Sequence, residues 1–340
     1  MIDLDKIKAL LLNAPRYRFV QIDKLLFQDL IGDWQDATTL PKNLREILKL
    51  QAPITIENEI SASSDGKTTK ALLTLNDSLK IETVLMGFKD RDTVCVSSQV
   101  GCPLSCTFCA TGMMGYKRSL TISEIVGQAI FFARLLKKES KKVTNIVFMG
   151  MGEPFLNYNN VWGAIETLND PSKFGLGARH ISISTSGIIE GINKLSNESL
   201  EVNLAISLHA PNNDLRSRLM PINKKYPLKD LLESVGNYAR ETRRKVMFEY
   251  IMLDGVNDSK AEAEQLSNLL KNPLYHLNLI QYNETGIFKP SSQERLNVFK
   301  KVLLMKHISF TERFRFGTDI NAACGQLAVS QEYNKKSLVH

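Results

Sequence analysis

The chain has 340 residues, of which 43% are hydrophobic and 23% are charged, values that are ordinary for a folded globular protein. No apolar run approaches the roughly 18 residues of a membrane-spanning helix, and acids near the N-terminus do not fit a secretory signal, so we expect a cytoplasmic protein with no membrane partner. The formal net charge of +7 fits a polyanionic partner such as RNA, although many basic proteins bind none.

Residues 1–50 are predicted to form a small helical domain. Apolar residues keep a helical spacing from Leu4 to Leu11 and from Ile22 to Ile31, and a third short helix is expected after Pro41. Basic residues lie on the polar faces of these helices, where ordinary solvation is a simpler explanation than binding of nucleic acid.

The period of the apolar residues changes to two between about residues 52 and 88. Three strand-like runs, separated by turn signals at Ser64–Gly66 and Asn76–Asp77, predict a β-meander, so we assign residues 51–87 to a β-extension. Glu82 lies on the third run, where a carboxylate is usually exposed or paired with a neighbouring strand.

Four of the five cysteines lie between Cys95 and Cys109, and Cys102, Cys106 and Cys109 have the spacing CxxxCxxC. An odd number of cysteines gathered in one motif does not resemble a disulfide framework. Zinc sites usually take two ligands from each of two short segments, and we find no second such segment. Three thiolates can instead bind a four-iron cluster and leave one iron open, with a structural zinc loop or chance clustering as the alternative.

After the cysteines, strand-like runs alternate with amphipathic helices, which predicts a parallel sheet built from βα units. Six or seven such units form either a partial TIM-type barrel or an open sheet, and both place chemistry at the carboxyl ends of the strands. Thr121 and Glu124 have the spacing of a capping box. The predicted strands lie at residues 93–98, 144–150, 180–186, 202–209, 245–253, 276–283 and 307–314, and the helices near 121–137, 159–169, 188–197, 228–243, 258–271 and 292–306.

Glycines and polar residues follow several of the predicted strands. The first group is Gly150-Met151-Gly152-Glu153, whose glycines allow close approach of a ligand and whose carboxylate can bind a cationic amine. Ser184, the run Ser207–His209 and Asn283 lie at the ends of three other strands. Each signal is weak alone, and His209 is equally well explained as a satisfied core histidine, but together they predict one site.

The fifth cysteine, Cys324, stands alone near the C-terminus. A lone cysteine is more often a small buried hydrophobic residue than a reagent. Its neighbours Ala322, Ala323 and Gly325 are small, which suits a thiol that must reach into a crowded site.

The chain resembles a known family over about residues 16–330. The spacing CxxxCxxC, with an aromatic residue at Phe108, is typical of radical S-adenosylmethionine (SAM) enzymes. The two outlying cysteines, Cys95 and Cys324, make the chain similar to the RlmN/Cfr family of radical SAM RNA methyltransferases. The landmarks of that family occur in order: IETV at 81–84, CVSSQVGC at 95–102, CATG at 109–112, GMGEP at 150–154, STSG at 184–187, SLHAPN at 207–212, LMPINKKY at 219–226, YIMLDGVND at 250–258 and AACGQL at 322–327.

This resemblance implies an α/β fold in which a partial (β/α) TIM-type radical SAM barrel occupies residues 88–317. The segment 318–340 would carry the methyl-carrier cysteine, Cys324. Cys102, Cys106 and Cys109 would bind a 4Fe-4S cluster whose open iron chelates SAM. The positions that match SAM contacts in the family are Gly152, Glu153, Ser184, Ser207, Leu208, His209 and Asn283.

The resemblance also implies a ping-pong mechanism that consumes two SAM molecules per turnover. One SAM methylates Cys324, and the second gives an adenosyl radical that takes a hydrogen from the S-methyl group. The resulting carbon radical adds to an adenine, after which Cys95 helps to remove the ring proton and forms a disulfide with Cys324. Glu82 matches the proton-acceptor position of the family, so the base is either Cys95 or Glu82. A flavodoxin- or ferredoxin-type donor would reduce the disulfide.

The implied substrates are RNA. RlmN enzymes methylate carbon 2 of an adenosine in the peptidyl-transferase centre of 23S ribosomal RNA and of the adenosine 3′ of the tRNA anticodon. Cfr enzymes methylate carbon 8 and confer ribosomal antibiotic resistance. Pro154, with the motifs STSG and MPINKKY, favours the RlmN branch, whereas Phe316–Asp319 resembles Cfr, and Glu284 and Asn321 depart from the family pattern.

Two other interpretations stay open. The first is a radical SAM enzyme of different specificity, in which Cys95 and Cys324 are merely structural. The second is an iron–sulfur electron carrier or RNA-binding module that cleaves no SAM. In each case we expect a monomer.

Overall fold

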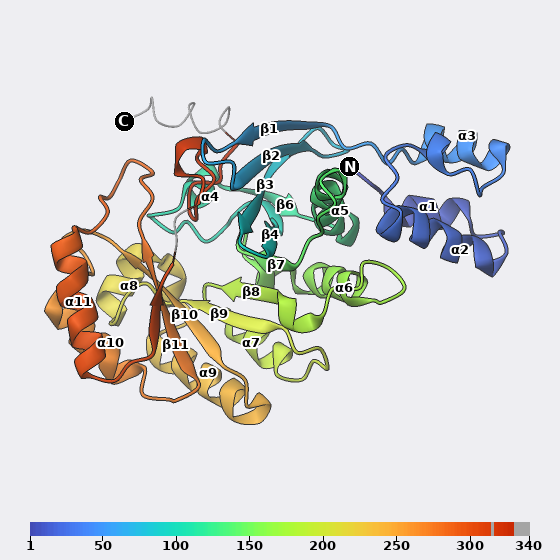
Figure 1. Ribbon diagram of the computed structural model, residues 1–340. Coiled ribbons are helices and arrows are strands. Elements are labelled where there is room, and N and C mark those ends of the chain that lie inside the picture. The colour runs from blue at the N-terminus through green and yellow to red at the C-terminus, as the bar shows by residue number, and fades with distance from the viewer. Residues whose placement is uncertain (314–315, 330–340) are drawn as a thin grey trace.

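The computed structural model describes residues 1–313 and 316–329 of the chain. Its centre is one curved sheet, with a helical region at one end and further helices around the outside (Figure 1). The predictions for residues 314 and 330–340, which belong to the last strand-like run and to the C-terminal segment, lie outside the described residues.

The N-terminal helices predicted from the apolar spacing are confirmed. Trp34 fixes the end of the third helix, because its Nε1 donates a hydrogen bond of 2.8 Å to the carbonyl of Ala52 and its ring is fully buried. The second helix continues into a π-helical turn at Lys24–Gln28. The three helices are α1 (Leu4–Leu10), α2 (Arg16–Asp23) and α3 (Lys42–Gln51).

The predicted β-meander is also confirmed, and it continues the main sheet instead of forming a separate layer. Its strands are antiparallel to one another, and β3 is antiparallel to β4, with Val84 opposite Cys95. The chain turns at the predicted signals, where Gly66 and Ser78 take a positive φ. These strands are β1 (Asn58–Ala62), β2 (Thr68–Thr74), β3 (Lys80–Phe88) and β4 (Arg91–Cys95).

From β4 onward the described strands of this main sheet run parallel in the order β4-β7-β8-β9-β10-β11-β12, and β5 and β6 belong to a separate small sheet. Among the described residues β1 and β12 form the two edges of the sheet and do not pair, so the predicted partial barrel is confirmed. The inner strands are largely buried on both faces, which explains their nearly continuous apolar runs. They are β7 (Asn145–Phe148), β8 (Ile181–Thr185), β9 (Asn203–Ser207), β10 (Val246–Met252), β11 (Tyr275–Gln281) and β12 (Phe310–Glu312).

The long helices predicted between the strands are confirmed and cover the outside of the barrel (Figure 1). None of the helices in residues 1–313 and 316–329 has the length and apolar character needed to cross a membrane. The helices are α5 (Ile122–Lys138), α6 (Tyr158–Asn169), α7 (Ile189–Leu195), α9 (Leu228–Thr242), α10 (Lys260–Leu269) and α11 (Gln293–Met305).

Two short strands and two short α-helices among the described residues were not predicted. The strands β5 (Gln99–Gly101) and β6 (Tyr116–Ser119) form a hairpin around the cysteine motif, and the helices α4 (Ala110–Met114) and α8 (Asn213–Leu219) follow the cysteines and β9. Elements of three to seven residues are too short to show a period, and they depend on tertiary contacts for their stability.

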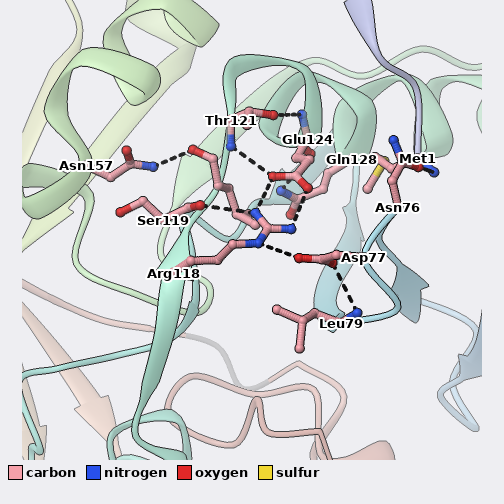
Figure 2. A network of polar contacts seen from close by, with 11 residues as sticks. Met1, Asn76, Asp77, Leu79, Arg118, Ser119, Thr121, Glu124, Gln128 and Asn157 are labelled. Carbon is pink, nitrogen blue, oxygen red and sulfur yellow. Dashed lines mark hydrogen bonds and ion pairs between the residues drawn. The ribbon is translucent and has the colours of Figure 1, made fainter.

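Arg118 on β6 fixes the hairpin around the cysteine motif to the rest of the molecule (Figure 2). Its guanidinium donates two hydrogen bonds of 2.8 Å to Glu124 on α5 and one of 2.7 Å to Asp77 in the β2–β3 turn. Glu124 also accepts a hydrogen bond from the Thr121 amide, and the Thr121 hydroxyl accepts one from the Glu124 amide, so the predicted capping box is confirmed. The cysteine motif is therefore held between two parts of the scaffold.

Candidate active site

The loop that carries Cys102, Cys106 and Cys109 lies between β5 and α4, against the carboxyl ends of the barrel strands. Leu104, Cys106 and Phe108 belong to a small apolar cluster with residues of α8 and β10. The ring of Phe108 meets the ring of His209 edge to face, with centroids 4.9 Å apart. The aromatic residue of the motif thus anchors the loop to the end of β9.

The chemistry of the three thiols fits an iron–sulfur cluster. Burial raises the pKa of Cys102 to about 12, and the pKa of Cys106 is raised by burial and by the charges of its two partner cysteines. Three neighbouring thiolates in a desolvated loop need a cationic group to compensate them, and bound iron supplies one. Within the described residues no three His, Cys, Asp or Glu side chains are arranged to hold a single metal ion. Each cysteine of a four-iron cluster ligates a different iron, so convergence on one point is not required.

Gly150 and Gly152 allow the end of β7 to pack against the segment that follows β4. A Cβ atom on Gly152, whose φ is +100°, would lie 2.5 Å from the Cβ of Gln99. A Cβ atom on Gly150 would lie 2.8 Å from the carbonyl oxygen of Val96. These contacts give the glycines a packing role in addition to the ligand approach predicted from the sequence.

Glu153 is almost fully buried at the end of β7 and ties that strand to β8. Its carboxylate accepts hydrogen bonds from the amides of Phe155 at 3.1 Å and Ser186 at 2.7 Å, while its own amide donates to Gln99. Burial raises the pKa of Glu153, and these donors oppose the shift. A carboxylate has about four lone-pair positions, so this one still has capacity for a cationic ligand.

The predicted residues on β8 and β9 lie side by side at one level of the barrel. The hydroxyl oxygens of Ser184 and Ser207 are 3.5 Å apart, and the amide of the buried Leu208 donates to the carbonyl of Glu249 on β10. His209 is also buried, its Nδ1 accepts a hydrogen bond from the Ile251 amide at 3.1 Å, and burial lowers its pKa to about 3. The His209 side chain is therefore neutral and has a hydrogen-bond partner in the core, and its contact with SAM stays a prediction.

Asn283, just after β11, links the strand ends to the loop that carries Cys324. Its Nδ2 donates to the carbonyl of Cys324 at 3.3 Å, while its Oδ1 is buried and has no hydrogen-bond partner. A buried acceptor without a partner is costly. Oδ1 is therefore an open position for a polar ligand, which fits the predicted contact with SAM.

Cys95 and Cys324 line the same cavity, which has a volume of about 540 Å³. Cys95 lies buried at the end of β4, whereas Cys324 is exposed on the segment after β12. Asn283 lines this cavity too, and Glu82 does not. The fold thus brings together two cysteines that lie 229 positions apart in the sequence.

Comparisons with known proteins agree with this site. The model of the radical SAM superfamily matches residues 96–266. "Ribosomal RNA large subunit methyltransferase N" of Nitrosopumilus maritimus is 45% identical over 328 residues, which cover 93% of each chain. "Probable dual-specificity RNA methyltransferase RlmN" of Dictyoglomus turgidum is 43% identical over 325 residues, or 95% of this chain and 93% of that one. The chain belongs to the RlmN family of radical SAM RNA methyltransferases.

The fold comparison supports the same assignment. A solved structure of a radical SAM methyltransferase from Sphaerobacter thermophilus is 44% identical, has a TM-score of 0.92, and aligns over 96% of this chain and 97% of that one. The protein is therefore a SAM-dependent radical RNA methyltransferase, and its superfamily uses a 4Fe-4S cluster and SAM.

The RlmN-family barrel also holds an ion pair between a buried carboxylate and a half-buried arginine that the sequence analysis missed. Glu249 on β10 lies 3.7 Å from Arg313, and its other oxygen accepts a hydrogen bond of 2.9 Å from Asn278. Burial raises the pKa of Cys95 to about 12. Desolvation of the thiol among the residues that line the cavity raises that of Cys324, although the residue as a whole is exposed, and the positive charge of Arg313 opposes both shifts. A single glutamate inside the apolar run of β10 was the signal that could have revealed this pair.

A second residue missed in this RlmN-family site is Arg216 on α8, which is fully buried. Its guanidinium donates to the carbonyls of Ser186 at 2.7 Å, Ser207 at 3.0 Å and Leu208 at 3.2 Å. Burial lowers the pKa of Arg216 to about 10, so it stays charged at neutral pH. It therefore fixes the two strand ends that carry the predicted SAM contacts.

Replacing Arg216 with Met is expected to lower the free energy of unfolding by about 3 kcal/mol, because one buried and two half-buried carbonyls lose the charged donor that they share. Affinity for SAM should fall as well. The control is Arg218→Met, an exposed arginine on the same helix, which should change neither quantity. Thermal unfolding and equilibrium dialysis with SAM measure the two effects, and equal behaviour of the two variants would contradict this role.

Proposed function

We propose that this enzyme methylates carbon 2 of an adenosine in the peptidyl-transferase centre of 23S ribosomal RNA, and of the adenosine 3′ of the tRNA anticodon. The observation that carries the proposal is the cavity shared by Cys95 and Cys324, because this chemistry needs two thiols beside one base. Among the relatives, a ribosomal RNA large subunit methyltransferase supports the ribosomal substrate, and a probable dual-specificity RNA methyltransferase supports a second RNA substrate.

The bound cluster and SAM would supply a methyl group for a thiolate and an adenosyl radical. Cys324 would accept the methyl group from one SAM by displacement, since a thiolate is a good nucleophile for a sulfonium methyl. The S-methyl group, after loss of a hydrogen atom to the radical from a second SAM, would add to the adenine ring. With the bound cluster as acceptor of the unpaired electron of the adduct, Cys95 would remove the ring proton. Its sulfur would then attack the sulfur of Cys324, so that the C–S bond breaks as the S–S bond forms, and the new methyl carbon takes up a proton as the product leaves.

The residues around the two thiols fit these roles. Burial raises the pKa of Cys95 to about 12, so its thiolate, once formed, is a strong base, and the positive charge of Arg313 favours that form. The exposure of Cys324 leaves its sulfur accessible from the cavity. A cavity of about 540 Å³ is in the range of small-ligand sites, so an adenine turned out of folded RNA fits here.

Three partners follow from this chemistry. The disulfide must be reduced after each turnover, which a flavodoxin- or ferredoxin-type protein would do. Both RNA substrates and this donor place the enzyme in the cytoplasm, where thiols stay reduced. We also propose that it acts as a monomer, since one chain carries the cluster cysteines and both outlying cysteines.

The test is nucleoside mass spectrometry on ribosomal and transfer RNA from cells that lack this protein and from the same cells expressing it. We expect a gain of 2-methyladenosine in both fractions. A gain in ribosomal RNA alone would remove the tRNA part of the proposal. If neither 2-methyladenosine nor 8-methyladenosine is formed although the protein holds its cluster, the proposal is overturned.

Carbon 8 is the second candidate position, because a stretch that resembles Cfr borders the cavity. Phe316 lines the cavity and packs edge to face on Phe88, with centroids 6.2 Å apart. A side chain at this place can change which edge of the adenine faces Cys324. A gain of 8-methyladenosine in the same experiment would favour this candidate.

A further inference from the structure

One ion pair of the β-extension holds the chain on both sides of Cys324. The Nζ atom of Lys70 on β2 lies 3.0 Å from Oε1 of Glu82 on β3, and both side chains are largely buried. Lys70 also donates to the carbonyl of Asn321 at 3.3 Å, and Glu82 Oε2 accepts a hydrogen bond of 2.8 Å from the amide of Ala328. The ion pair thus binds the backbone three residues before Cys324 and four residues after it.

Further contacts hold the same segment, residues 316–329, which we call the carrier loop. On the side of the β-extension, the amide of Ser64 donates to Asp319 at 2.8 Å. On the side of the cysteine motif, Thr111 donates to the carbonyl of Leu327 at 2.6 Å, and the Ala110 amide donates to that of Gly325 at 2.8 Å. Figure 1 shows the carrier loop in red between α4 and the β-extension.

Glu82 itself is directed to the carrier loop and not to the cavity. Val84 and Met86, on the same strand, line the cavity of the two thiols, whereas Glu82 does not. Each of its carboxylate oxygens has a partner that holds the carrier loop, Lys70 for Oε1 and the Ala328 amide for Oε2. A base that takes a proton from an adenine in the cavity needs hydrogen-bond reach to that proton, directly or through a water.

We propose that Glu82 is a positioning residue that holds the carrier loop, and that it does not accept the proton of the substrate base. The proposal rests on the proposed function, because it presumes that Cys324 carries the methyl group. It leaves Cys95 as the proton acceptor.

The charge of Glu82 is part of this role. Burial raises the pKa of Glu82, and Lys70 together with the Ala328 amide opposes the shift. A proton on the carboxylate would remove the ion pair and weaken the hydrogen bond to Ala328. If Glu82 were the base, every turnover would loosen the loop that presents Cys324.

The test compares Glu82→Gln with Glu82→Leu in the cluster-loaded full chain. Glutamine keeps an oxygen that accepts from the Ala328 amide but cannot act as a base, whereas leucine keeps neither property. We expect Glu82→Gln to retain RNA methylation within about tenfold of the original rate, and Glu82→Leu to lose at least about 100-fold. The control is Glu59→Gln, an exposed carboxylate on β1 that is paired with Lys80 and should have no effect.

Hydrogen exchange of residues 322–329 gives a second measure, independent of RNA. Exchange should rise modestly in Glu82→Gln, which loses the charge but keeps an acceptor for the Ala328 amide, and should rise far more in Glu82→Leu. If glutamine loosens the loop because Lys70 is left unpaired, the added change Lys70→Gln should restore both exchange and activity. A glutamine variant with native exchange, a full cluster and no activity would overturn the proposal, and so would native exchange in Glu82→Leu. If the original enzyme makes no methyladenosine, the proposed function is overturned instead. The exchange comparison would still test whether Glu82 holds the carrier loop.

Discussion

Cys324→Ala is expected to abolish RNA methylation, with a loss of at least about 1,000-fold, while the cluster stays intact. Alanine offers no nucleophile to the methyl group of SAM and no S-methyl carbon to the radical. The side chain of Cys324 is exposed, so its truncation leaves no cavity in the core and should change the free energy of unfolding by less than about 0.5 kcal/mol. The backbone contacts of the carrier loop with Asn283 and Ala110 do not involve the thiol and should persist.

Three measurements on this variant separate the steps. Iron and sulfide content should equal that of the original enzyme, because Cys102, Cys106 and Cys109 are unchanged. SAM cleavage without RNA should continue at a measurable rate, whereas methyladenosine should be absent. Methyladenosine formed at a normal rate by Cys324→Ala would mean that another group carries the methyl, and the proposed mechanism would then be wrong.

Cys95→Ala is expected to trap a covalent link between Cys324 and the RNA. Without the second thiol in the cavity, the ring proton has no acceptor and no disulfide can form, so the product cannot leave. The loss of one buried sulfur should cost only about 1 kcal/mol, and the protein should fold. Nuclease digestion followed by mass spectrometry should find an adenosine joined to Cys324 through one carbon.

The link should survive thiol reductants, because it is a carbon–sulfur bond and not a disulfide. The double variant Cys95→Ala with Cys324→Ala serves as the control and should give no adduct. Free RNA and normal turnover by Cys95→Ala would exclude the assigned role and would return the proton-acceptor role to Glu82 for renewed testing.

The sequence predicted where the reactive residues lie along the chain better than it predicted which of them meet in the fold. CxxxCxxC located the cluster loop, and period-two and helical patterns located the strands, because both signals are local in the chain. The expectation that Cys95 and Cys324 act together came only from the family resemblance. No local pattern could supply it, since it depends on how a ten-stranded sheet curves.

Side-chain environments were the hardest to predict. The sequence left His209 open between a ligand and a core residue, and only the hydrogen bond from the Ile251 amide favours the second. Arg216 was missed because an arginine in a polar stretch normally points to solvent, whereas this one is enclosed by the ends of β8 and β9. Glu82 was expected to be exposed or paired across strands, and it is paired with Lys70 on β2.

The contacts between the β-extension and the carrier loop have a consequence for the order of folding. They join residues 246 to 255 positions apart, from Ser64 to Asp319 and from Glu82 to Ala328. On the ribosome, β1 to β3 emerge long before the carrier loop does, so Lys70 and Glu82 have no partner on that loop until residues 321–328 have been made. Cys324 therefore reaches the cavity as one of the last steps of folding, and a chain truncated before it has only the Cys95 thiol in that cavity.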